Sequence, residues 1–252
     1  MLWALALACC APSARHDPLI FRVFSTANVT ARTQALWHAS ARLSGVPLHR
    51  HRLVVDGSPF ATDALARCNV TGLYAALVAP AFRGDLMRYC ILYLYGGMYL
   101  DLMAKLTHPA ARFFSHDLVV VNDIPRSMYW NGFMAGRRGH PAFKRAMRYI
   151  RWNVRRCKRT STPLGVTGPA LWHQAASRYR PVVAGTLRPC DDMFEGCRVV
   201  DGVFMNKMPD YNAEFARMGY KLSQKYTSLW NRGIIYDDKV CKLYDFASLF
   251  HL

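Results

Sequence analysis

The sequence predicts an α/β fold in which helices cover both faces of a mostly parallel sheet. β-rich runs alternate with helix-like stretches along most of the chain, which is the pattern of such layered folds. The length of 252 residues and the apolar fraction of 52% suffice for one domain with a sizeable core. An apolar helix that passes through two glycines into a strand, at Phe82–Met103, is the most specific element. We therefore expect one domain over residues 15–252.

The elements of the N-terminal half follow from short β-rich runs and longer apolar periodicity. A Gly-Ser-Pro turn at residues 57–59 separates the second strand from the helices after it. The expected order is a strand at Leu19–Ser25, a helix at Thr33–Leu43, a strand at His51–Asp56, a looser helical region at Asp63–Val78, a helix at Phe82–Tyr95 and a strand at Met98–Leu102.

The segment Phe82–Met103 carries three ionisable side chains in an apolar setting. Asp85 and Arg88 are three residues apart, so a helix places both side chains on one face. The Gly-Gly pair that follows suits the left-handed conformation that ends a helix. Asp101 falls at the carboxyl end of the next strand, where open α/β sheets bind their ligands. Taken alone, the Asp-Arg spacing is also typical of a buried structural salt bridge.

In the C-terminal half, a strongly basic stretch stands out among the predicted elements. Its apolar residues recur at helical spacing, so it reads as a helix with a charged outer face. The expected order is strands at Leu118–Val121 and Tyr129–Ala135, the basic helix at Pro141–Cys157, a shorter helix at Leu171–Arg178 and a strand at Arg198–Met205.

The positive charge is unevenly spread. The formal net charge is +17, and fourteen Lys and Arg but no acidic residue lie between Asp123 and Asp191. A solvated helix face accounts for this pattern, and the functional alternatives are an anionic acceptor, a membrane surface touched by helix 141–157, or nucleic acid. We expect no nucleic-acid partner, because no helix-turn-helix, zinc-finger or RNA-recognition signature accompanies the charge.

Eight cysteines are many for a reducing compartment. Removal of Cys9 and Cys10 with an N-terminal signal leaves six, an even number that suits disulfides. Cys190 and Cys197 are the best candidate pair, and a metal site is not indicated because the chain has no CxxC motif. Cys90 lies in the apolar helix, where we expect a free buried thiol.

The N-terminal residues 1–14 suit a signal peptide, the remnant of a longer signal-anchor, or a buried N-terminal segment. The apolar run Met1–Ala11 is too short to span a bilayer, which takes about 20 residues. Asn28-Val29-Thr30 and Asn69-Val70-Thr71 are glycosylation acceptors if the chain enters the secretory pathway.

The Asp-x-x-Arg-Tyr, Tyr-Gly-Gly and Tyr-x-Asp elements of Phe82–Met103 resemble the core of glycosyltransferase family 32, the yeast initiating α-1,6-mannosyltransferases and their relatives. They are also similar to the glucosylating domain of large clostridial toxins. Further resemblance covers Trp130–Ala135, Gly139–Pro141, Thr167–Pro169 and Lys225–Trp230, so that it extends over residues 20–236.

This resemblance implies a GT-A type fold, a nucleotide-sugar-binding α/β sandwich. It also implies a retaining hexosyltransferase that moves a sugar from a UDP- or GDP-sugar to a glycan, glycoprotein or glycolipid acceptor in the secretory pathway, in the Golgi lumen. A catalytically inactive relative that binds nucleotide sugars or glycans is the competing hypothesis.

The resemblance also assigns roles to residues. Carboxylates accept from sugar hydroxyls, and guanidinium groups donate to them or neutralise a diphosphate. The implied catalytic residues are Asp85, Arg88, Asp101 and Lys225, and the implied substrate-binding residues are Tyr99, Asn131, Gly132, Thr167, Gly168 and Trp230. For the Asn-Gly and Thr-Gly pairs, plain turn formation is the simpler alternative.

The chain departs from the family pattern at the usual metal site. Asp101 matches the first Asp of the DXD motif, but Met103 stands where the second Asp would bind Mn²⁺ or Mg²⁺. A thioether is a poor ligand for these hard cations, and Lys225 replaces the family's C-terminal His. Either the protein depends little on a metal or it has lost catalysis. We expect Arg88 and Lys225 to supply positive charge in place of the ion.

Overall fold

The computed structural model describes residues 19–102, 104, 106, 109, 111–123, 127–188, 198–199 and 211–241. The expected signal at residues 1–14, the Cys190–Cys197 pair and Met103 lie outside these residues. Among the described residues, no helix combines the length and the apolar character that crossing a membrane requires.

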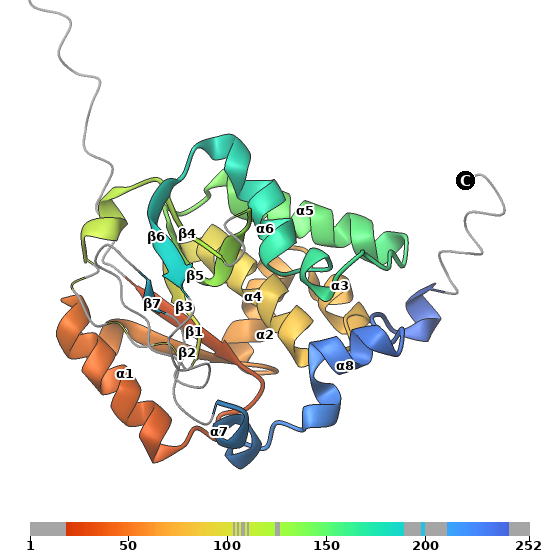
Figure 1. Cartoon of the computed structure of the whole chain (residues 1–252), viewed down its shortest axis with the longest axis horizontal. Helices are drawn as coiled ribbons and strands as arrows, with labels where there is room; N and C mark the ends of the chain where they lie inside the picture. The colour runs from red at the N-terminus through yellow and green to blue at the C-terminus, as the bar shows by residue number, and fades with distance from the viewer. Residues whose placement is uncertain are drawn as a thin grey trace, which may run out of the picture.

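The strands that the structure describes form one sheet in the order β2-β1-β3-β5-β4-β6-β7 (Figure 1). β1 pairs in parallel with β2 and β3, and β4 with β6, whereas β5 runs antiparallel to both β3 and β4 and β7 runs antiparallel to β6. Five of these strands therefore share one direction, which confirms the mostly parallel sheet. Their bounds are β1 Ile20–Phe24, β2 His51–Val55, β3 Gly97–Leu100, β4 Leu118–Asn122, β5 Tyr129–Gly136, β6 Val182–Arg188 and β7 Arg198–Val199.

The chain order reverses at β1. The chain passes from β1 through α1 to β2 on one side, and β3 later pairs with the other side of β1. In α/β sheets, ligands bind at such a reversal, beside the carboxyl ends of the two strands that flank it, which here are β1 and β3. Asp101, the first residue after β3, therefore lies at the expected binding edge.

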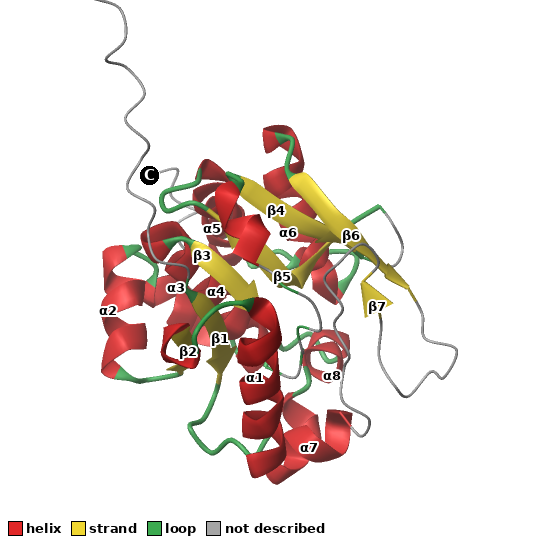
Figure 2. Cartoon of the chain, turned by 90° about the vertical axis from the view of Figure 1, so that its left-hand side faces the viewer, coloured by secondary structure: helices red, strands yellow, loops and turns green. Residues whose placement is uncertain are grey.

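Helices cover both faces of the sheet, as predicted. α1 lies on one face, whereas α2, α4, α5 and α6 pack on the other (Figures 1 and 2). The larger core cluster, which includes Phe21, Tyr99 and Met134 of the strands, lies on the second face. The helices are α1 Ala31–Ser44, α2 Pro59–Arg67, α3 Thr71–Ala76, α4 Pro80–Tyr95, α5 Pro141–Arg155, α6 Pro169–Ala176, α7 Tyr211–Arg217 and α8 Tyr226–Asn231.

The central helix α4 owes its sharp end to two glycines. Gly96 and Gly97 have φ values of 67° and 94°, as the sequence predicted for this pair. A Cβ on Gly96 would lie 2.6 Å from the backbone nitrogen of Arg138, and one on Gly97 would lie 2.5 Å from the carbonyl oxygen of Leu19. Larger residues would therefore collide with the backbone just after β5 and just before β1.

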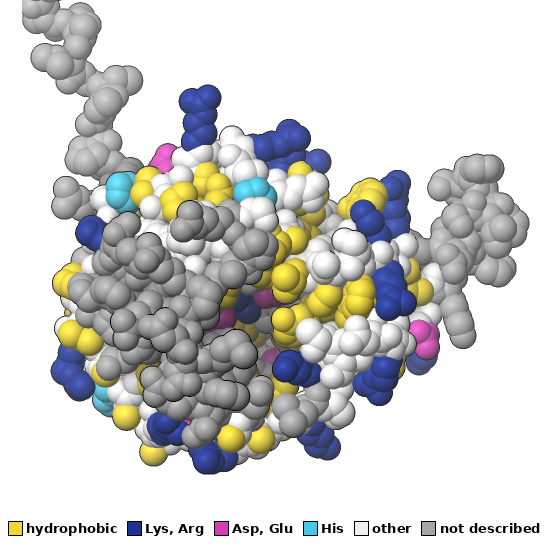
Figure 3. Space-filling model, viewed as in Figure 1, with side chains coloured by type: hydrophobic (Ala, Val, Ile, Leu, Met, Phe, Trp, Pro, Cys, Tyr) yellow, Lys and Arg dark blue, Asp and Glu magenta, His cyan; other side chains and the backbone are white. Residues whose placement is uncertain are grey.

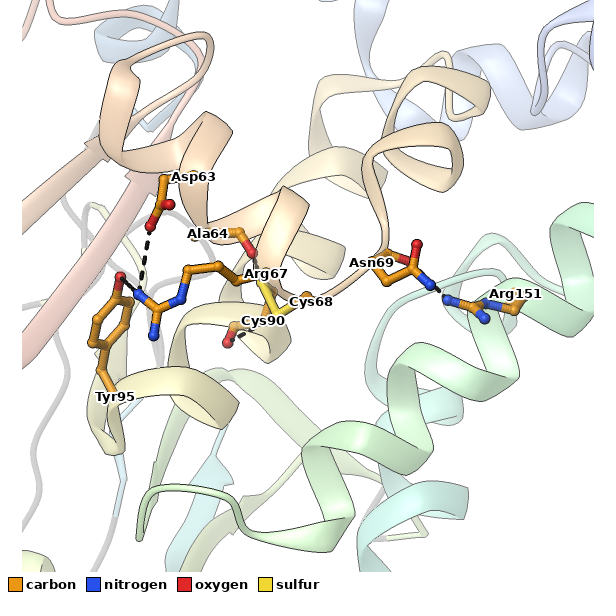
Figure 4. Close-up of a disulfide and its surroundings, with 8 residues drawn as sticks. All are labelled: Asp63, Ala64, Arg67, Cys68, Asn69, Cys90, Tyr95 and Arg151. Atoms are coloured by element: carbon orange, nitrogen blue, oxygen red, sulfur yellow. Dashed lines mark hydrogen bonds and ion pairs between the residues drawn. A yellow bond between two sulfur atoms is a disulfide. The ribbon is translucent and has the colours of Figure 1, made fainter.

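A disulfide joins the end of α2 to the middle of α4 (Figure 4). Cys68 caps α2 and bonds to Cys90, with 6.0 Å between their Cα atoms. The expectation of a free thiol at Cys90 was therefore wrong. The two cysteines meet because α2 packs on α4, a contact between helices that the sequence spacing does not reveal. A second disulfide joins Cys157, just after α5, to Cys241.

Other differences from the predicted elements are local. The looser helical region is two helices, α2 and α3, separated at Asn69, which has a φ of 54°. The strand expected at Arg198–Met205 is described only as the two residues of β7. The strand β6 was missed because it has little alternation, and Val182 and Val183 at its start are exposed.

Candidate functional site

Arg88 on α4 links the elements of the candidate site. Its Nη2 lies 3.1 Å from Oδ1 of Asp85, and its Nη1 lies 3.1 Å from Oδ1 of Asp101 after β3. The same Nη1 donates to the carbonyl of Asn131 on β5 at 2.8 Å. The guanidinium also lies over the ring of Tyr99, 4.3 Å from its centroid. One cation therefore joins a helix and two strands at the switch point.

Asp85 is held from several directions and is 8% exposed. Besides Arg88, its Oδ1 accepts a hydrogen bond from Nδ2 of Asn131 at 2.9 Å, and its Oδ2 accepts one from the hydroxyl of Thr167 at 2.7 Å. Gly168 lies beside this oxygen, because a Cβ there would meet Oδ2 at 3.5 Å, an ordinary van der Waals contact. Both carboxylate oxygens thus already have protein donors.

Asp101 is the more accessible carboxylate, with 32% of its side chain exposed. Its Oδ1 accepts from Arg88 and from the hydroxyl of Tyr99, the latter at 3.0 Å. Its backbone nitrogen donates to the carbonyl of Gly132 at 2.8 Å. Among the residues that the structure describes, none donates to its Oδ2. That oxygen can accept a hydrogen bond from a bound ligand.

A bulge in β5 turns Asn131 toward Asp85. Val120 of β4 pairs with Met134, but the next residue, Val121, pairs with Trp130. Residues 131–133 of β5 therefore have no pairing partner on β4. Bulges of this kind re-aim side chains. Gly132 is required within it, because a Cβ there would overlap the ring of Trp130 and approach Oδ2 of Asp101 to 2.5 Å.

Burial and charge set the protonation states of the site. Burial raises the pKa of Asp85 above its usual value, and the Arg88 cation and the Thr167 hydrogen bond offset part of this effect. Burial alone would lower the pKa of Arg88, but Tyr99, Asp85 and Asp101 raise it overall, so the guanidinium stays charged. Burial raises the pKa of Tyr99 well above its usual value, which keeps its hydroxyl a donor.

Two nearby residues were not singled out from the sequence. Tyr226 at the start of α8 packs against Phe82 of α4, with ring centroids 6.0 Å apart. Burial raises its pKa, and the carboxylates of Asp85, Asp123 and Asp101 raise it further. Asp123 directly follows β4, a strand end of the kind that identified Asp101, and that signal was available in the sequence.

The network reaches solvent at Asp101, whose side chain is 32% exposed. Figure 3 shows acidic and basic side chains at the bottom of a hollow in the middle of one face, with hydrophobic side chains along one side of it. Polar groups at the bottom of an apolar-walled hollow are the usual composition of a small-ligand site.

The structure therefore brings eight of the ten predicted site residues into one connected group, and two lie apart on α8. Lys225 is exposed and caps α8, and no contact joins it to the Asp85–Arg88 network among the described residues. Trp230 lies under Arg159, whose guanidinium is 4.7 Å from its ring centroid. Its buried indole N–H has no partner in the described part of the chain. The connected group is Asp85, Arg88, Tyr99, Asp101, Asn131, Gly132, Thr167 and Gly168.

The described donor set fits a hard divalent ion poorly. Oδ1 of Asp101 already binds Arg88 and Tyr99, and both oxygens of Asp85 are occupied. Within the part of the chain that the structure describes, no three His, Cys, Asp or Glu side chains are grouped as metal ligands. Mg²⁺ and Mn²⁺ prefer a nearly complete shell of oxygens. We derive no catalytic step through a metal.

Comparison with known proteins agrees with this location of the site. Residues 33–118 match the model of the glycosyltransferase sugar-binding region containing DXD motif, and this segment includes Asp85, Arg88 and Asp101. The match supports the glycosyltransferase superfamily and does not single out family 32. No curated protein sequence matches the chain. Among solved structures, the chain is similar to "PaToxG Glycosyltransferase", with a TM-score of 0.47, 13% identity and 88% of each chain covered.

Proposed function

We propose that this protein is a family 32 glycosyltransferase that moves a sugar from a UDP- or GDP-sugar to a glycan, glycoprotein or glycolipid acceptor, with retention at the anomeric carbon. The observation that carries the proposal is the bridge from Asp85 through Arg88 to Asp101, at the switch point and inside the segment that matches the sugar-binding region. Retention rests on the family resemblance alone.

The proposed roles follow from accessibility. No described residue donates to Oδ2 of Asp101, and 32% of this side chain is exposed, so we assign it to a hydroxyl of the donor. Asp85 is buried, and both of its carboxylate oxygens already accept hydrogen bonds. We therefore assign it to orienting Arg88 and the loop before α6. Arg88 faces the charge that develops on the leaving diphosphate, but two carboxylates already compensate part of its charge. A second cation is then needed, and Lys225 is the candidate.

The acceptor side of the proposal draws on α5. Four residues at helical spacing on its outer face are exposed, and no acidic residue lies near them in sequence. Such a stripe attracts an anionic acceptor or a membrane surface that presents one. Trp152, which lies between the cations, suits the boundary between water and lipid. The stripe consists of Lys144, Arg148, Trp152 and Arg155.

We propose the secretory pathway, in the Golgi lumen, as the site of action. Disulfides persist in oxidising compartments, and the structure holds two, Cys68–Cys90 and Cys157–Cys241. Asn28 and Asn69, the two glycosylation acceptors, are exposed. Imaging of the tagged full chain beside organelle markers tests this proposal, and a cytosolic location would contradict it.

The activity test uses purified protein and a panel of UDP- and GDP-sugars. Nucleotide release or sugar transfer with at least one donor is expected, and thermal shift identifies which donors bind, since a bound ligand raises stability as RT ln(1 + [L]/Kd). Asp101→Asn is the matched low-activity control, because 32% of the Asp101 side chain is exposed and its loss disturbs the fold less than loss of Arg88. No donor binding and no turnover with any donor would contradict the proposal.

An inactive donor-binding relative is the second candidate function, because Met103 occupies a position where the family has a metal-binding Asp. Measurable donor binding without any turnover would favour it. For the active enzyme, Lys225→Ala should lower turnover more than donor affinity, because the cation acts mainly on the transition state. An equal loss of affinity and turnover would instead assign Lys225 to ground-state binding.

A further inference from the structure

The turn after β3 is held by side chains from β1 and α1. Nη1 of Arg22 donates to the carbonyl of Asp101 at 2.7 Å and to the carbonyl of Ala104 at 3.1 Å. The indole N–H of Trp37 donates to the carbonyl of Leu102 at 3.1 Å. Within the turn, the backbone nitrogen of Ala104 donates to the carbonyl of Asp101 at 2.9 Å. Three carbonyls of this short turn therefore accept hydrogen bonds from two side chains.

Arg22 is an unusual residue for its position. It lies in the middle of a strand that is otherwise apolar, and it is 2% exposed. Its Nε and Nη2 have no hydrogen-bond partner among the residues that the structure describes. Burial lowers the pKa of Arg22 to about 9, which still leaves the guanidinium charged at neutral pH. A buried charge with unsatisfied donors costs stability, so packing alone does not explain an arginine here.

Arg22 and Arg88 act on the same residue from opposite faces of the sheet. Arg22 shares its strand face with Ile20 and Phe24, because side chains alternate along a strand, whereas Phe21 packs with the α4 side. Arg22 thus holds the backbone carbonyl of Asp101 from the α1 side. The carboxylate of Asp101 meets Arg88 on the α4 side.

We propose that Arg22 is a positioning residue of the donor site: it holds the carbonyls of Asp101 and Ala104, so that the carboxylate of Asp101 stays against Arg88. The proposal rests on the proposed function, because it takes Asp101 as the donor-facing carboxylate. The backbone nitrogen of Asp101 is fixed on Gly132. Among the described residues, loss of Arg22 leaves the Asp101 carbonyl with the Ala104 amide as its donor, which loosens the turn beyond it.

Hydrogen exchange tests the hold on the turn without any assumption about activity. Arg22→Met keeps the length of the side chain but removes its donors and charge, and Trp37→Phe keeps a ring but removes the indole donor. Arg52→Met on β2 is the matched control, because Arg52 is exposed and its backbone pairs with Phe21. In Arg22→Met, the Ala104 amide should exchange at least about 10-fold faster, with smaller acceleration in Trp37→Phe and none in the control.

Either folded variant can refute the hold on the turn. Unchanged exchange of the 101–106 segment in Arg22→Met would overturn the proposal. If Arg22→Met fails to fold, unchanged exchange in Trp37→Phe would do the same, since that variant removes one of the side-chain donors to the turn.

Kinetics test the link to Asp101. Arg22→Met should lower kcat/KM for the donor about 10- to 100-fold, because it misplaces the carboxylate assigned to a donor hydroxyl. In an Asp101→Asn background, the same substitution should cost less than about 2-fold, since its effect passes through that carboxylate. Equal losses in both backgrounds would overturn the proposal. A wild-type protein without turnover would contradict the proposed function, and the exchange result would still decide whether Arg22 holds the turn.

Discussion

Removal of Arg88 should destabilise the fold, and the loss should grow with pH. Arg88→Met leaves Asp85, which is 8% exposed, without its cation. Breaking a buried pair on one side costs about 3–5 kcal/mol, because the remaining charge is left uncompensated. Asp101 contributes less to this loss, since 32% of its side chain is exposed and water can solvate it. We expect the full loss at pH 8.

The pH dependence follows from the direction of the shift at Asp85. Its pKa is already raised by burial in the folded protein, and Arg88 is the largest effect that lowers it. Without Arg88 the pKa rises further. A carboxyl group with a raised folded pKa binds its proton more tightly in the native state, so stability falls as pH rises through that pKa. At pH 5 the loss should therefore be smaller by about 1–2 kcal/mol.

Urea denaturation at pH 5 and pH 8 measures both effects. Asp85→Asn combined with Arg88→Met should recover part of the stability, because it removes the orphaned charge. Arg67→Met is the matched control: Arg67 forms an exposed pair with Asp63 at 3.4 Å beside Tyr95 (Figure 4), and its loss should cost less than about 1 kcal/mol. An Arg88→Met protein with equal losses at both pH values, and no recovery in the double variant, would refute this reasoning.

Three further predictions concern a disulfide, two histidines and a metal. Cys68→Ser opens the loop to Cys90, whose sequence separation is 22, and should lower the free energy of unfolding by about 3 kcal/mol in urea; an unchanged midpoint would argue against the bond. Burial lowers the pKa of His51 and His140 to about 4, so both side chains are neutral in the folded protein at neutral pH. The free energy of unfolding should therefore fall as pH drops from about 6.5 toward 4, by at most about 1.4 kcal/mol per pH unit for each histidine. His140→Asn keeps a good N-cap for α5 and should flatten this slope, whereas an unchanged slope would remove His140 as a source. Chelation with EDTA should leave the affinity for UDP or GDP, measured by calorimetry, unchanged. Weak metal dependence would be contradicted by activity that the chelator abolishes, or by an ion bound to Asp101 and other protein oxygens.

The most specific part of the fold could be predicted because its signals are local. The helix at 82–95, the two glycines and the strand after them follow from residues close in sequence, and φ values of 67° and 94° at Gly96 and Gly97 match that prediction. The contact between Asp85 and Arg88 follows from helical spacing in the same way.

Features that depend on distant residues could not be predicted. Arg22 looks like an ordinary outward-facing residue of a strand, and the carbonyls that explain it belong to residues 79 and 82 positions later. The bond between Cys68 and Cys90 requires two helices to pack, and the contact of Asn131 with Asp85 requires a bulge. None of these leaves a periodic signal in the sequence.

The location of β1 limits how this protein can be shortened for study. The segment with the recognisable similarity begins at residue 33, but β1 at Ile20–Phe24 pairs with both β2 and β3. A fragment cut to residues 33–118 would leave those two strands with facing rows of unpaired backbone groups, which promote aggregation. It would also lack Asn131 and Thr167, the donors to Asp85. Expression trials should keep the chain from at least residue 19 through residue 241, whatever boundary similarity alone suggests.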